Sequence, residues 1–377
     1  MPGYEIIDKK EFLAVKKIFD EGGVLFAHGF DNLRKKYYVR EFEKKNAQFF
    51  KSKYTLAVTS GTAAIKVALK SIGVKPGDEV ITQAFNFIAT VEAILDVGAI
   101  PIMVNVDENL NIKISEIKNK ITKKTKAIIP VHMLGLSCEM DKIKRICKKK
   151  NIKIIEDNCE SVGAKFDKAY LGTIGDIGIF SFDHGKILTT GEGGLILTNN
   201  KRLYLNAKEY HDHGHKNVKN KPRGRDEMKS PGFNYRMTEL QGAIGTVQLK
   251  KLPLILKENK KRYNIFKNVL SKKVKFREHL SNSIPNYDTI IFYENNKNKI
   301  NKVLKIIKDN KFSTKNLPDA IRWHCSSYWS HIFNKEDINQ MKPTLKILKK
   351  SIAIPILLKK NLKDYKSLAK NILKIYL

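Results

Sequence analysis

The sequence predicts an α/β fold, with a large domain on a mostly parallel β-sheet covered by helices and a smaller C-terminal α+β domain. From about residue 54, short apolar runs alternate with amphipathic stretches, as they do in strand–helix repeats. After about residue 235, one long helical stretch is followed by short strands and Lys-rich helices. We therefore assign residues 1–250, including an N-terminal arm, to the large domain and residues 251–377 to the small one.

The first elements alternate strictly. "YTLAVTS" (54–60) predicts a buried strand that ends in small polar residues, and "GTAAIKVALKSIG" (61–73) predicts a helix with apolar residues at helical spacing. A second strand over 78–83 precedes a helix over 88–98, which Gly98 closes. This order is typical of a parallel sheet.

The remaining elements follow the same rules. We expect strands at 100–106, 126–133, 152–157, 177–182, 193–199 and 288–293, and helices at 139–151 and 237–270. In open α/β sheets, ligands bind at the carboxyl ends of the strands. Polar residues directly after these strands are therefore the candidates for chemistry.

The charge is strongly positive, with 71 Lys and Arg against 38 Asp and Glu and a net charge of +33. Residues 251–377 hold 29 basic and 9 acidic residues. This balance raises nucleic-acid or anionic-membrane binding, but the lysines are spread along the chain and no nucleic-acid module is recognisable. No apolar stretch reaches about 18 residues, and the N-terminus lacks a signal-peptide pattern. We expect a cytoplasmic protein that binds neither nucleic acid nor membrane.

Metal ligation is not expected. The four cysteines form no C-x-x-C pair, which argues against a zinc site or a disulfide framework. His211, His213 and His215 alternate, so on a strand they would share one face and could ligate a metal. Their flanks are polar and no carboxylate follows at a typical spacing. We predict a substrate-facing or structural loop instead.

Three motifs could carry chemistry. "TSGTAA" (59–64) places Ser60, Gly61 and Thr62 where a strand meets a helix, which suits either a phosphate site or an ordinary N-cap. "IIEDNCES" (154–161) ends a strand on carboxylates, which are either functional or cap a loop. Lys186 follows "IGIFSF" and precedes the turn "TTGEGG". An isolated lysine is usually surface, but near a phosphate site and a carboxylate it suggests Schiff-base chemistry.

Together these motifs resemble the DegT/DnrJ/EryC1/StrS sugar aminotransferase family. "SGTAA", "PGDEVIT", "IEDN", "GDIGIFSF" followed by the lysine, "TTGEGG" and "GFNYRM" stand in the family's order between residues 23 and 249, about two thirds of the chain. Residues 251–377 match only loosely. The resemblance implies fold type I, the aspartate-aminotransferase-like fold, with pyridoxal 5′-phosphate (PLP) as cofactor. It also implies a homodimer with active sites at its interface.

The resemblance also implies roles for single residues. Lys186 matches the lysine that anchors the cofactor and shuttles a proton, and Asp157 matches the carboxylate that pairs with the pyridine nitrogen. The implied cofactor contacts beyond these are Ser60, Gly61, Thr62, Phe87, Glu160, Ser181 and, from the neighbouring subunit, Asn234. Phe87 would stack on the cofactor ring. The implied substrate contacts are His213, His132 and Tyr235.

Two positions depart from the family pattern. Glu160 stands where Gln or His is usual, near the cofactor's 3′-oxygen. A carboxylate facing a phenolate would repel it unless protonated or turned away. Leu134 stands where an aromatic residue is common. A dehydratase subset of the family replaces the lysine by histidine. Lys186 is present here, and His184 is not in register to replace it.

The function implied is transfer of an amino group from L-glutamate, through pyridoxamine phosphate, to a keto- or aldehydo-sugar for bacterial surface polysaccharide. Most relatives act on nucleotide-linked ketosugars. "YHDHGHKN" and the segment after it resemble a subgroup that aminates 3-deoxy-octulosonate oxidised at C8. Two alternatives stay open: a PLP-dependent sugar dehydratase, and a non-catalytic DNA-binding or regulatory protein on the same fold.

Overall fold

A seven-stranded sheet lies at the centre of the protein. We describe residues 2–218, 221–228 and 230–377 from a computed structural model. The strand order is β1-β9-β8-β5-β4-β2-β3, and every pairing is parallel except the two made by β9. The strands are β1 (Tyr54–Val58), β2 (Glu79–Gln83), β3 (Ile100–Val104), β4 (Thr125–Ile129), β5 (Lys153–Asp157), β8 (Ile177–Ser181) and β9 (Gly194–Thr198). The predicted mostly parallel α/β sheet is confirmed.

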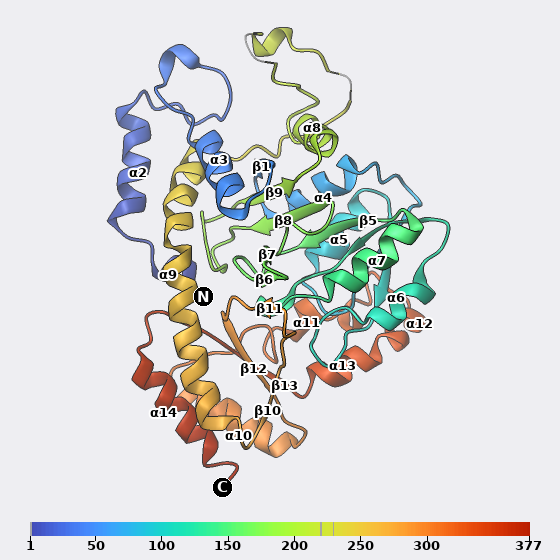
Figure 1. The fold of residues 1–377 in the computed structure, drawn as a ribbon, viewed down its shortest axis with the longest axis vertical. Coiled ribbons are helices and arrows are strands. Elements are labelled where there is room, and N and C mark those ends of the chain that lie inside the picture. Colours follow the sequence, from blue (N-terminus) through green and yellow to red (C-terminus); the bar gives the residue numbers. More distant parts are fainter. Residues whose placement is uncertain (1, 219–220, 229) are drawn as a thin grey trace.

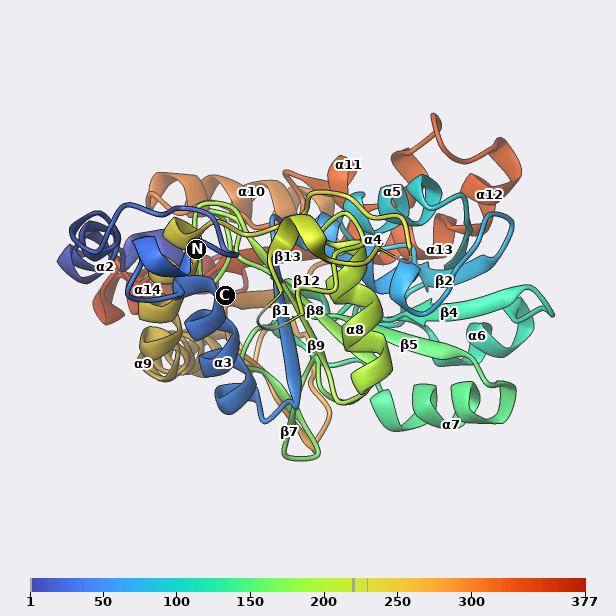
Figure 2. The same ribbon diagram turned by 90° about the horizontal axis from the view of Figure 1, so that it is seen from above.

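Helices cover both faces of this sheet (Figures 1 and 2). The surrounding helices are α3 (Tyr38–Phe50), α4 (Gly61–Ser71), α5 (Ala89–Asp96), α6 (Ile114–Lys120), α7 (Met140–Lys150) and α8 (Lys201–Tyr210). Val80 of β2 packs in the cluster that contains α4 and α5, whereas the next residue, Ile81, packs in the cluster of α6 and α7. Burial on both faces explains why the strands read as continuous apolar runs.

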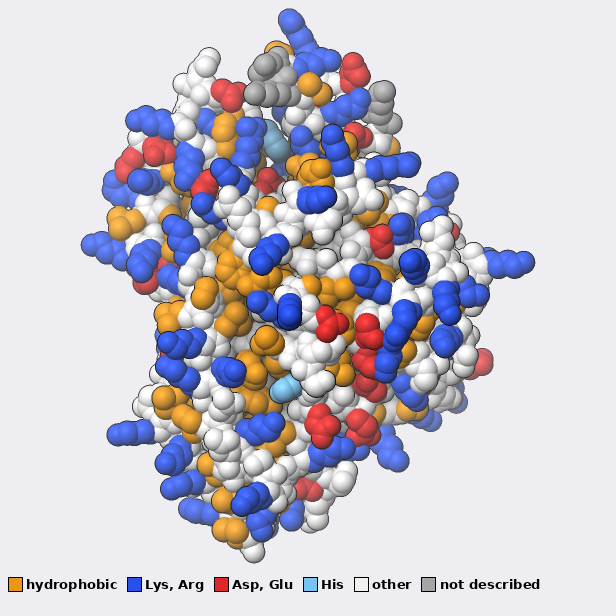
Figure 3. Space-filling model, viewed as in Figure 1, with side chains coloured by type: hydrophobic (Ala, Val, Ile, Leu, Met, Phe, Trp, Pro, Cys, Tyr) orange, Lys and Arg blue, Asp and Glu red, His pale blue; other side chains and the backbone are white. Residues whose placement is uncertain are grey.

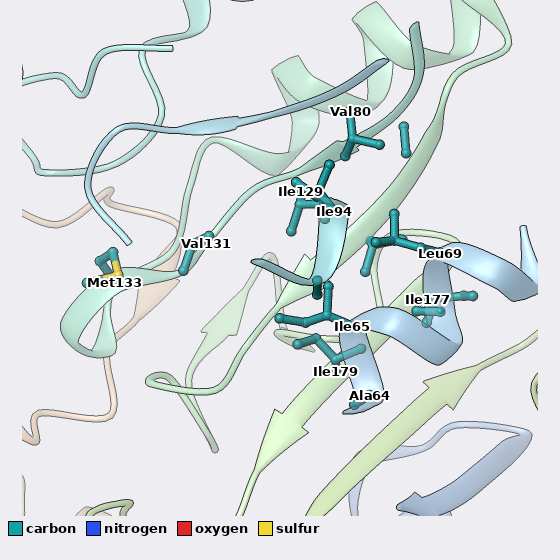
Figure 4. Close-up of a cluster of buried hydrophobic side chains, with 14 of the residues drawn as sticks. Ala64, Ile65, Leu69, Val80, Ile94, Ile129, Val131, Met133, Ile177 and Ile179 are labelled. Atoms are coloured by element: carbon teal, nitrogen blue, oxygen red, sulfur yellow. The ribbon is translucent and has the colours of Figure 1, made fainter. Parts of the chain in front are cut away.

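The packing of α4 fixes the start of that helix against the sheet. Ile65 and Leu69 of α4 point at Ile129 and Ile177 in the core (Figure 4). Ser60 caps the helix, because its side chain accepts a hydrogen bond from the Ala63 N–H at 3.1 Å. The first turn of α4 is therefore held rigidly at the carboxyl end of β1.

A second sheet, β10-β12-β13, organises the C-terminal part and is antiparallel throughout. Its strands are β10 (Lys275–Phe276), β12 (Thr289–Tyr293) and β13 (Ser351–Pro355), and the helices around it are α10 (Lys297–Asp309), α11 (Ile321–His324), α12 (Lys335–Gln340), α13 (Lys342–Leu348) and α14 (Leu362–Leu373). The segment between α11 and α12 packs on the large sheet's layer, because Trp329 and Phe333 pack with Ile88, which precedes α5. The two parts share buried contacts.

The longest helix, α9 (Glu239–Leu270), crosses the division that we place at 250/251. Its first half packs on α2 (Lys9–Asp20) and α3, and its second half packs on α14. Figure 1 shows it running along one side of the molecule, past both sheets. The division into 1–250 and 251–377 stays a prediction, and α9 belongs to both sides of it.

Local geometry corrects several sequence expectations. The strand expected over 126–133 ends at Ile129, because the chain turns through Met133–Gly135 with Leu134 at φ +51°. A small sheet that we did not predict joins β6 (Lys165–Phe166), β7 (Ala169–Tyr170) and β11 (Ser283–Ile284), which are too short to leave a periodic signal.

Among the described helices, none is long and apolar enough to cross a membrane. Lys and Arg are spread over the face in Figure 3.

Candidate active site

Three segments far apart in the sequence meet at the carboxyl ends of β1, β5 and β8. A Cβ placed on Gly61, at the start of α4, would lie 2.8 Å from Ser181 Cβ and 3.2 Å from Cys159 Sγ. Ser181 ends β8, and Cys159 follows the end of β5 at Asp157. The fold therefore brings "SGTAA", "IEDN" and the segment before Lys186 together, as the sequence predicts from their strand ends.

The N-terminus of α4 offers an anion site. The Ser60 hydroxyl accepts a hydrogen bond from the Ala63 N–H. Within the described part of the chain, no hydrogen bond uses the N–H groups of Gly61 or Thr62. Thr62 is exposed, whereas Gly61 and Ser181 are buried. Free N–H groups and the helix dipole favour a phosphate here. This arrangement fits the phosphate-binding role implied for these residues.

Gly61→Ala should weaken this site, because the added methyl group meets the buried Ser181 Cβ at 2.8 Å. We expect overpacking to cost about 1–3 kcal/mol of folding free energy, together with a higher dissociation constant for PLP. Chemical denaturation and cofactor titration measure the two effects. Gly224→Ala is the matched control, because a Cβ there meets no atom within 4 Å. Unchanged stability and cofactor affinity in Gly61→Ala would contradict the prediction.

Asp157 is the buried carboxylate of the site, with 4% of its surface exposed. Its carboxylate accepts hydrogen bonds from the Thr90 hydroxyl and the Cys159 N–H, each at 3.1 Å. Burial raises its pKa above the ordinary value, although these hydrogen bonds and the charge of Lys186 act in the opposite direction. Such a carboxylate is well placed to pair with a protonated ring nitrogen.

The neighbouring Glu156 has a structural role. Its buried carboxylate accepts the N–H groups of Gly172, Ile174 and Gly175, which hold the loop before β8. It also lies 3.2 Å from Nε2 of His132. On the other side of the ring, the Cys138 N–H lies 3.2 Å from Nδ1 of His132. His132 is fully buried with both ring nitrogens engaged, so this side chain is not free to contact a substrate.

Lys186 lies in a tight turn after β8. Its N–H donates to the Asp183 carbonyl at 3.0 Å, and the Gly185 N–H donates to the Asp183 side chain at 2.8 Å. The side chain of Lys186 is 19% exposed, and its Nζ lies 3.7 Å from Oε1 of Glu160. Burial alone would lower the pKa of the Lys186 amine, but the nearby negative groups, Glu160 first, outweigh it and raise this pKa. Lys186 is thus no ordinary surface lysine.

Glu160 is held in place as an anion. The Leu134 N–H donates to Oε2 at 3.2 Å, and the Asn316 amide donates to both carboxylate oxygens at 3.2 and 3.3 Å. Although burial alone would raise its pKa, the charges of Lys315 and Lys186 lower it to about 2. The lowered pKa favours the ionised carboxylate, which is directed toward Lys186, Leu134 and Asn316.

The C-terminal part supplies one wall of the site. The Asn86 N–H donates to the His324 carbonyl at 3.0 Å, and the Phe87 ring lies 5.4 Å from the His324 ring. Phe87 is 45% exposed and Trp323 is 60% exposed, so both present aromatic surface to solvent. Our sequence reasoning missed His324, Trp323 and Asn316. The aromatic cluster in "RWHCSSYW" is the signal that could have pointed to two of them.

The three histidines lie in a loop after α8, in agreement with the loop predicted for them. The chain turns at 211–216 and forms no strand, so His211, His213 and His215 do not share a strand face. His211 is buried, whereas His213 is exposed with φ +52°. Asp212 between them holds the loop by accepting hydrogen bonds from Arg223 and Arg236. Among the described residues, no cluster of His, Cys, Asp and Glu could hold a metal ion.

Asn234 and Tyr235 lie at the end of β1, not beside Lys186. The Thr59 N–H donates to the Tyr235 carbonyl at 2.9 Å, and the Tyr235 ring packs at a tilt against Phe233 and Tyr210. Asn234 is exposed. Arg236 and Met237, which follow Tyr235, help to line a cavity of about 700 Å³, together with His28, Arg40 and Lys208. Lys186, Asp157 and Ser181 are not among the residues that line it.

Comparison with known proteins decides the family. The family model described as the DegT/DnrJ/EryC1/StrS aminotransferase family matches residues 26–372. The chain belongs to this family. GDP-perosamine synthase of Escherichia coli O157:H7 is 39% identical over 231 residues, which cover 61% of this chain and 62% of that protein. The chain thus spans about three fifths of the length of the curated relatives that it matches.

Solved structures share the whole fold. The aminotransferase from Psychrobacter cryohalolentis superposes with a TM-score of 0.86 at 26% identity, over 98% of each chain. The GDP-4-keto-6-deoxy-D-mannose-3-dehydratase of E. coli, solved with bound hydrated PLP, gives a TM-score of 0.82 at 23% identity over 97% of each chain. The fold is therefore that of PLP-dependent aminotransferases, and family membership indicates PLP as the cofactor.

The residues present fit this cofactor. Free N–H groups at the start of α4 suit its phosphate, because Gly61 leaves space that a Cβ would fill. Asp157 is a buried carboxylate for the ring nitrogen, and Lys186 is a sheltered amine on the adjacent strand end. The half-exposed Phe87 offers a flat surface beside them. The donor set is thus complementary to a phosphorylated pyridine aldehyde.

Proposed function

We propose that this protein is a PLP-dependent aminotransferase that moves an amino group from L-glutamate to a keto- or aldehydo-sugar. One observation carries the proposal: the sheltered amine of Lys186, the buried carboxylate of Asp157 and the open N-terminus of α4 lie at one edge of the sheet in a member of this family. PLP, when bound, acts as an electron sink for the substrate's C–H bond. The chain's own residues bind and orient the cofactor and move the proton.

Each side chain has a distinct task in this proposal. The Gly61 and Thr62 N–H groups, with Ser181, bind and orient the phosphate. Asp157 keeps a proton on the ring nitrogen, and its hydrogen bonds from Thr90 and Cys159 fix its direction. Lys186 Nζ anchors the cofactor, and as the free amine it accepts and returns a proton at the substrate carbon. Phe87 and His324 shield this edge from water.

The dehydratase alternative is less well supported. The E. coli dehydratase shares the fold, so the fold alone does not separate the two reactions. In this chain, Lys186 stands at the family's reactive position. The nearby His184 stacks on Tyr4 instead, with ring centroids 5.0 Å apart. The regulatory alternative would need the basic excess gathered in one place, whereas Lys and Arg are spread over the face in Figure 3. The regulatory alternative would be favoured if the purified protein bound DNA but no PLP.

The sugar is best identified by direct assay. The similarity to GDP-perosamine synthase supports a nucleotide-linked ketosugar, while "YHDHGHKN" supports the octulosonate oxidised at C8. Glutamate-dependent amination should be measured with nucleotide ketosugars and the octulosonate aldehyde side by side. Amination of one of them is the expected result, in a pathway for surface polysaccharide that we place in the cytoplasm. If the purified protein binds no PLP, the proposal is overturned.

We further propose a homodimer in which Asn234 of one copy reaches the phosphate held by the other. The exposure of Asn234, which leaves its side chain open to a second copy, supports this. Lys186→Ala and Asn234→Asp should each be nearly inactive alone. Mixed subunits should regain about one quarter of the wild-type activity, because half of the randomly formed dimers carry one intact site of two. A mixture no more active than the separate variants would contradict the shared site, and sedimentation measures the dimer itself.

A further inference from the structure

Glu160 has a role that its position in the sequence does not explain. It replaces the residue that the family pattern leads us to expect, and its Oε1 lies 3.7 Å from Nζ of Lys186. The side chain of Glu160 is 8% exposed and that of Lys186 is 19% exposed. Opposite charges at this separation, largely removed from water, interact much more strongly than a surface pair. The contact joins the reactive amine to a fixed anion.

The anion is fixed by parts of the chain outside the lysine turn. The Leu134 N–H and the Asn316 amide occupy both carboxylate oxygens, at 3.2 and 3.3 Å. Leu134 adopts φ +51° in a short turn, and Asn316 comes from the C-terminal part of the chain. These donors keep Glu160 at charge-pair distance from Lys186 rather than in a hydrogen bond with it. The Glu160 carboxylate therefore keeps this position whether or not the Lys186 amine is free.

The surrounding charges favour the ionised pair. On the Glu160 side, Lys315 forms a 2.7 Å ion pair with Asp288, and His324 has a pKa that burial lowers. On the Lys186 side lie Asp157, Asp183 and the buried thiol of Cys159. Burial opposes both charges, yet the pKa of Glu160 falls to about 2 and that of Lys186 rises. The surrounding charges together outweigh burial: Lys315 and Lys186 stabilise the Glu160 anion, and Glu160 is the first of several negative groups that stabilise the Lys186 cation.

We propose that Glu160 is a positioning residue that stabilises the ammonium form of Lys186 once the free amine has accepted a proton. The inference rests on the proposed function only in making Lys186 the proton carrier. A carrier must be neutral to accept a proton and charged to return it, and Glu160 favours the charged state. The amine released from the cofactor therefore retains the proton that it has accepted until that proton is delivered.

The test measures the charge state of Lys186 in the full-length protein freed of cofactor. Acetic anhydride reacts with the neutral amine, so peptide mass spectrometry of Lys186 labelling across pH gives a half-point for its deprotonation. In Glu160→Gln we expect this half-point to fall by roughly one pH unit, which is about tenfold more labelling below both half-points. The matched control is Glu108→Gln, which also removes one negative charge, from an exposed pair with Lys275 and Lys350.

Two further measurements keep the test decisive. Glu160→Asp retains the charge, so its half-point should stay near that of the wild type. In the cofactor-loaded protein, the pH midpoint of the visible absorption band should also fall in Glu160→Gln. An unchanged half-point in Glu160→Gln, or an equal shift in the Asp or Glu108 variant, would overturn the proposal. Because labelling uses no cofactor, glutamate or sugar, it remains informative even if the proposed transamination is not observed.

Discussion

Lys186→Ala is expected to abolish turnover of glutamate. In the proposed function, the substitution removes both the amine that anchors the cofactor and the group that carries the proton. Loss of a positioned acid–base group alone lowers rates by on the order of 10²–10⁴-fold, and loss of the anchor adds to this. Production of 2-oxoglutarate measures turnover, and the visible absorption band of the loaded protein should disappear in the same variant.

The variant should remain folded, which separates this prediction from a loss of structure. Glu160 keeps its donors from Leu134 and Asn316 when Lys186 is removed. The exposed Lys201 at the start of α8 offers a control, because Lys201→Ala also removes one lysine charge but at a solvent-exposed position. We expect wild-type turnover and an unchanged absorption band in that control. Glutamate turnover retained in Lys186→Ala would exclude Lys186 as the reactive amine.

The sheet was predictable because burial on both faces leaves an unambiguous pattern. "IGIFSF" is apolar and bounded by turn residues, and β8 (Ile177–Ser181) stands where it indicates. Segment 210–216 was predicted as a loop, and the structure has a turn there rather than a strand. Alternation of histidines imitates a strand, but Asp212 binds Arg223 and Arg236 and turns the chain. Long-range ion pairs of this kind leave no local periodicity.

The candidate site was predictable where its residues end strands. Gly61, Asp157 and Ser181 follow β-sheet rules that bring carboxyl ends of parallel strands to one edge. Asn316 and His324 could not be found in this way, since they reach the site only through the packing of the C-terminal part on the large sheet. The sequence did single out Glu160 as unusual. Its ionised state depends on Lys315 and Asn316, which only the folded chain brings to it.

Asp157→Asn should lower turnover yet stabilise the cofactor-free protein. An amide cannot hold a proton on the ring nitrogen as a carboxylate does, and loss of such a preorganised charge lowers rates by on the order of 10²–10³-fold. The same buried charge is unfavourable for folding before the cofactor binds, because burial raises the pKa of Asp157. Function and stability therefore place opposite demands on this position.

The pH dependence gives the sign of the stability effect. With its pKa raised on folding, Asp157 binds more protons in the native than in the unfolded state above the ordinary value of 3.8. The stability of the wild type thus decreases as pH rises through the range between the two pKa values. Asn does not ionise, so the cofactor-free variant should have the higher Tm at neutral pH, and the difference should vanish at pH below the unfolded value.

Thermal unfolding of both proteins across pH, without cofactor, measures this difference. Asp176→Asn is the matched control, because Asp176 forms a 3.0 Å ion pair with Lys153 and also accepts the Ile154 N–H. Its removal should lower Tm and leave turnover largely intact. A neutral-pH Tm for Asp157→Asn equal to or below that of the wild type would show that the Thr90 and Cys159 hydrogen bonds already compensate the buried charge. The charge of Asp157 would then be stabilised by the fold itself, and the cofactor would not be needed to balance it.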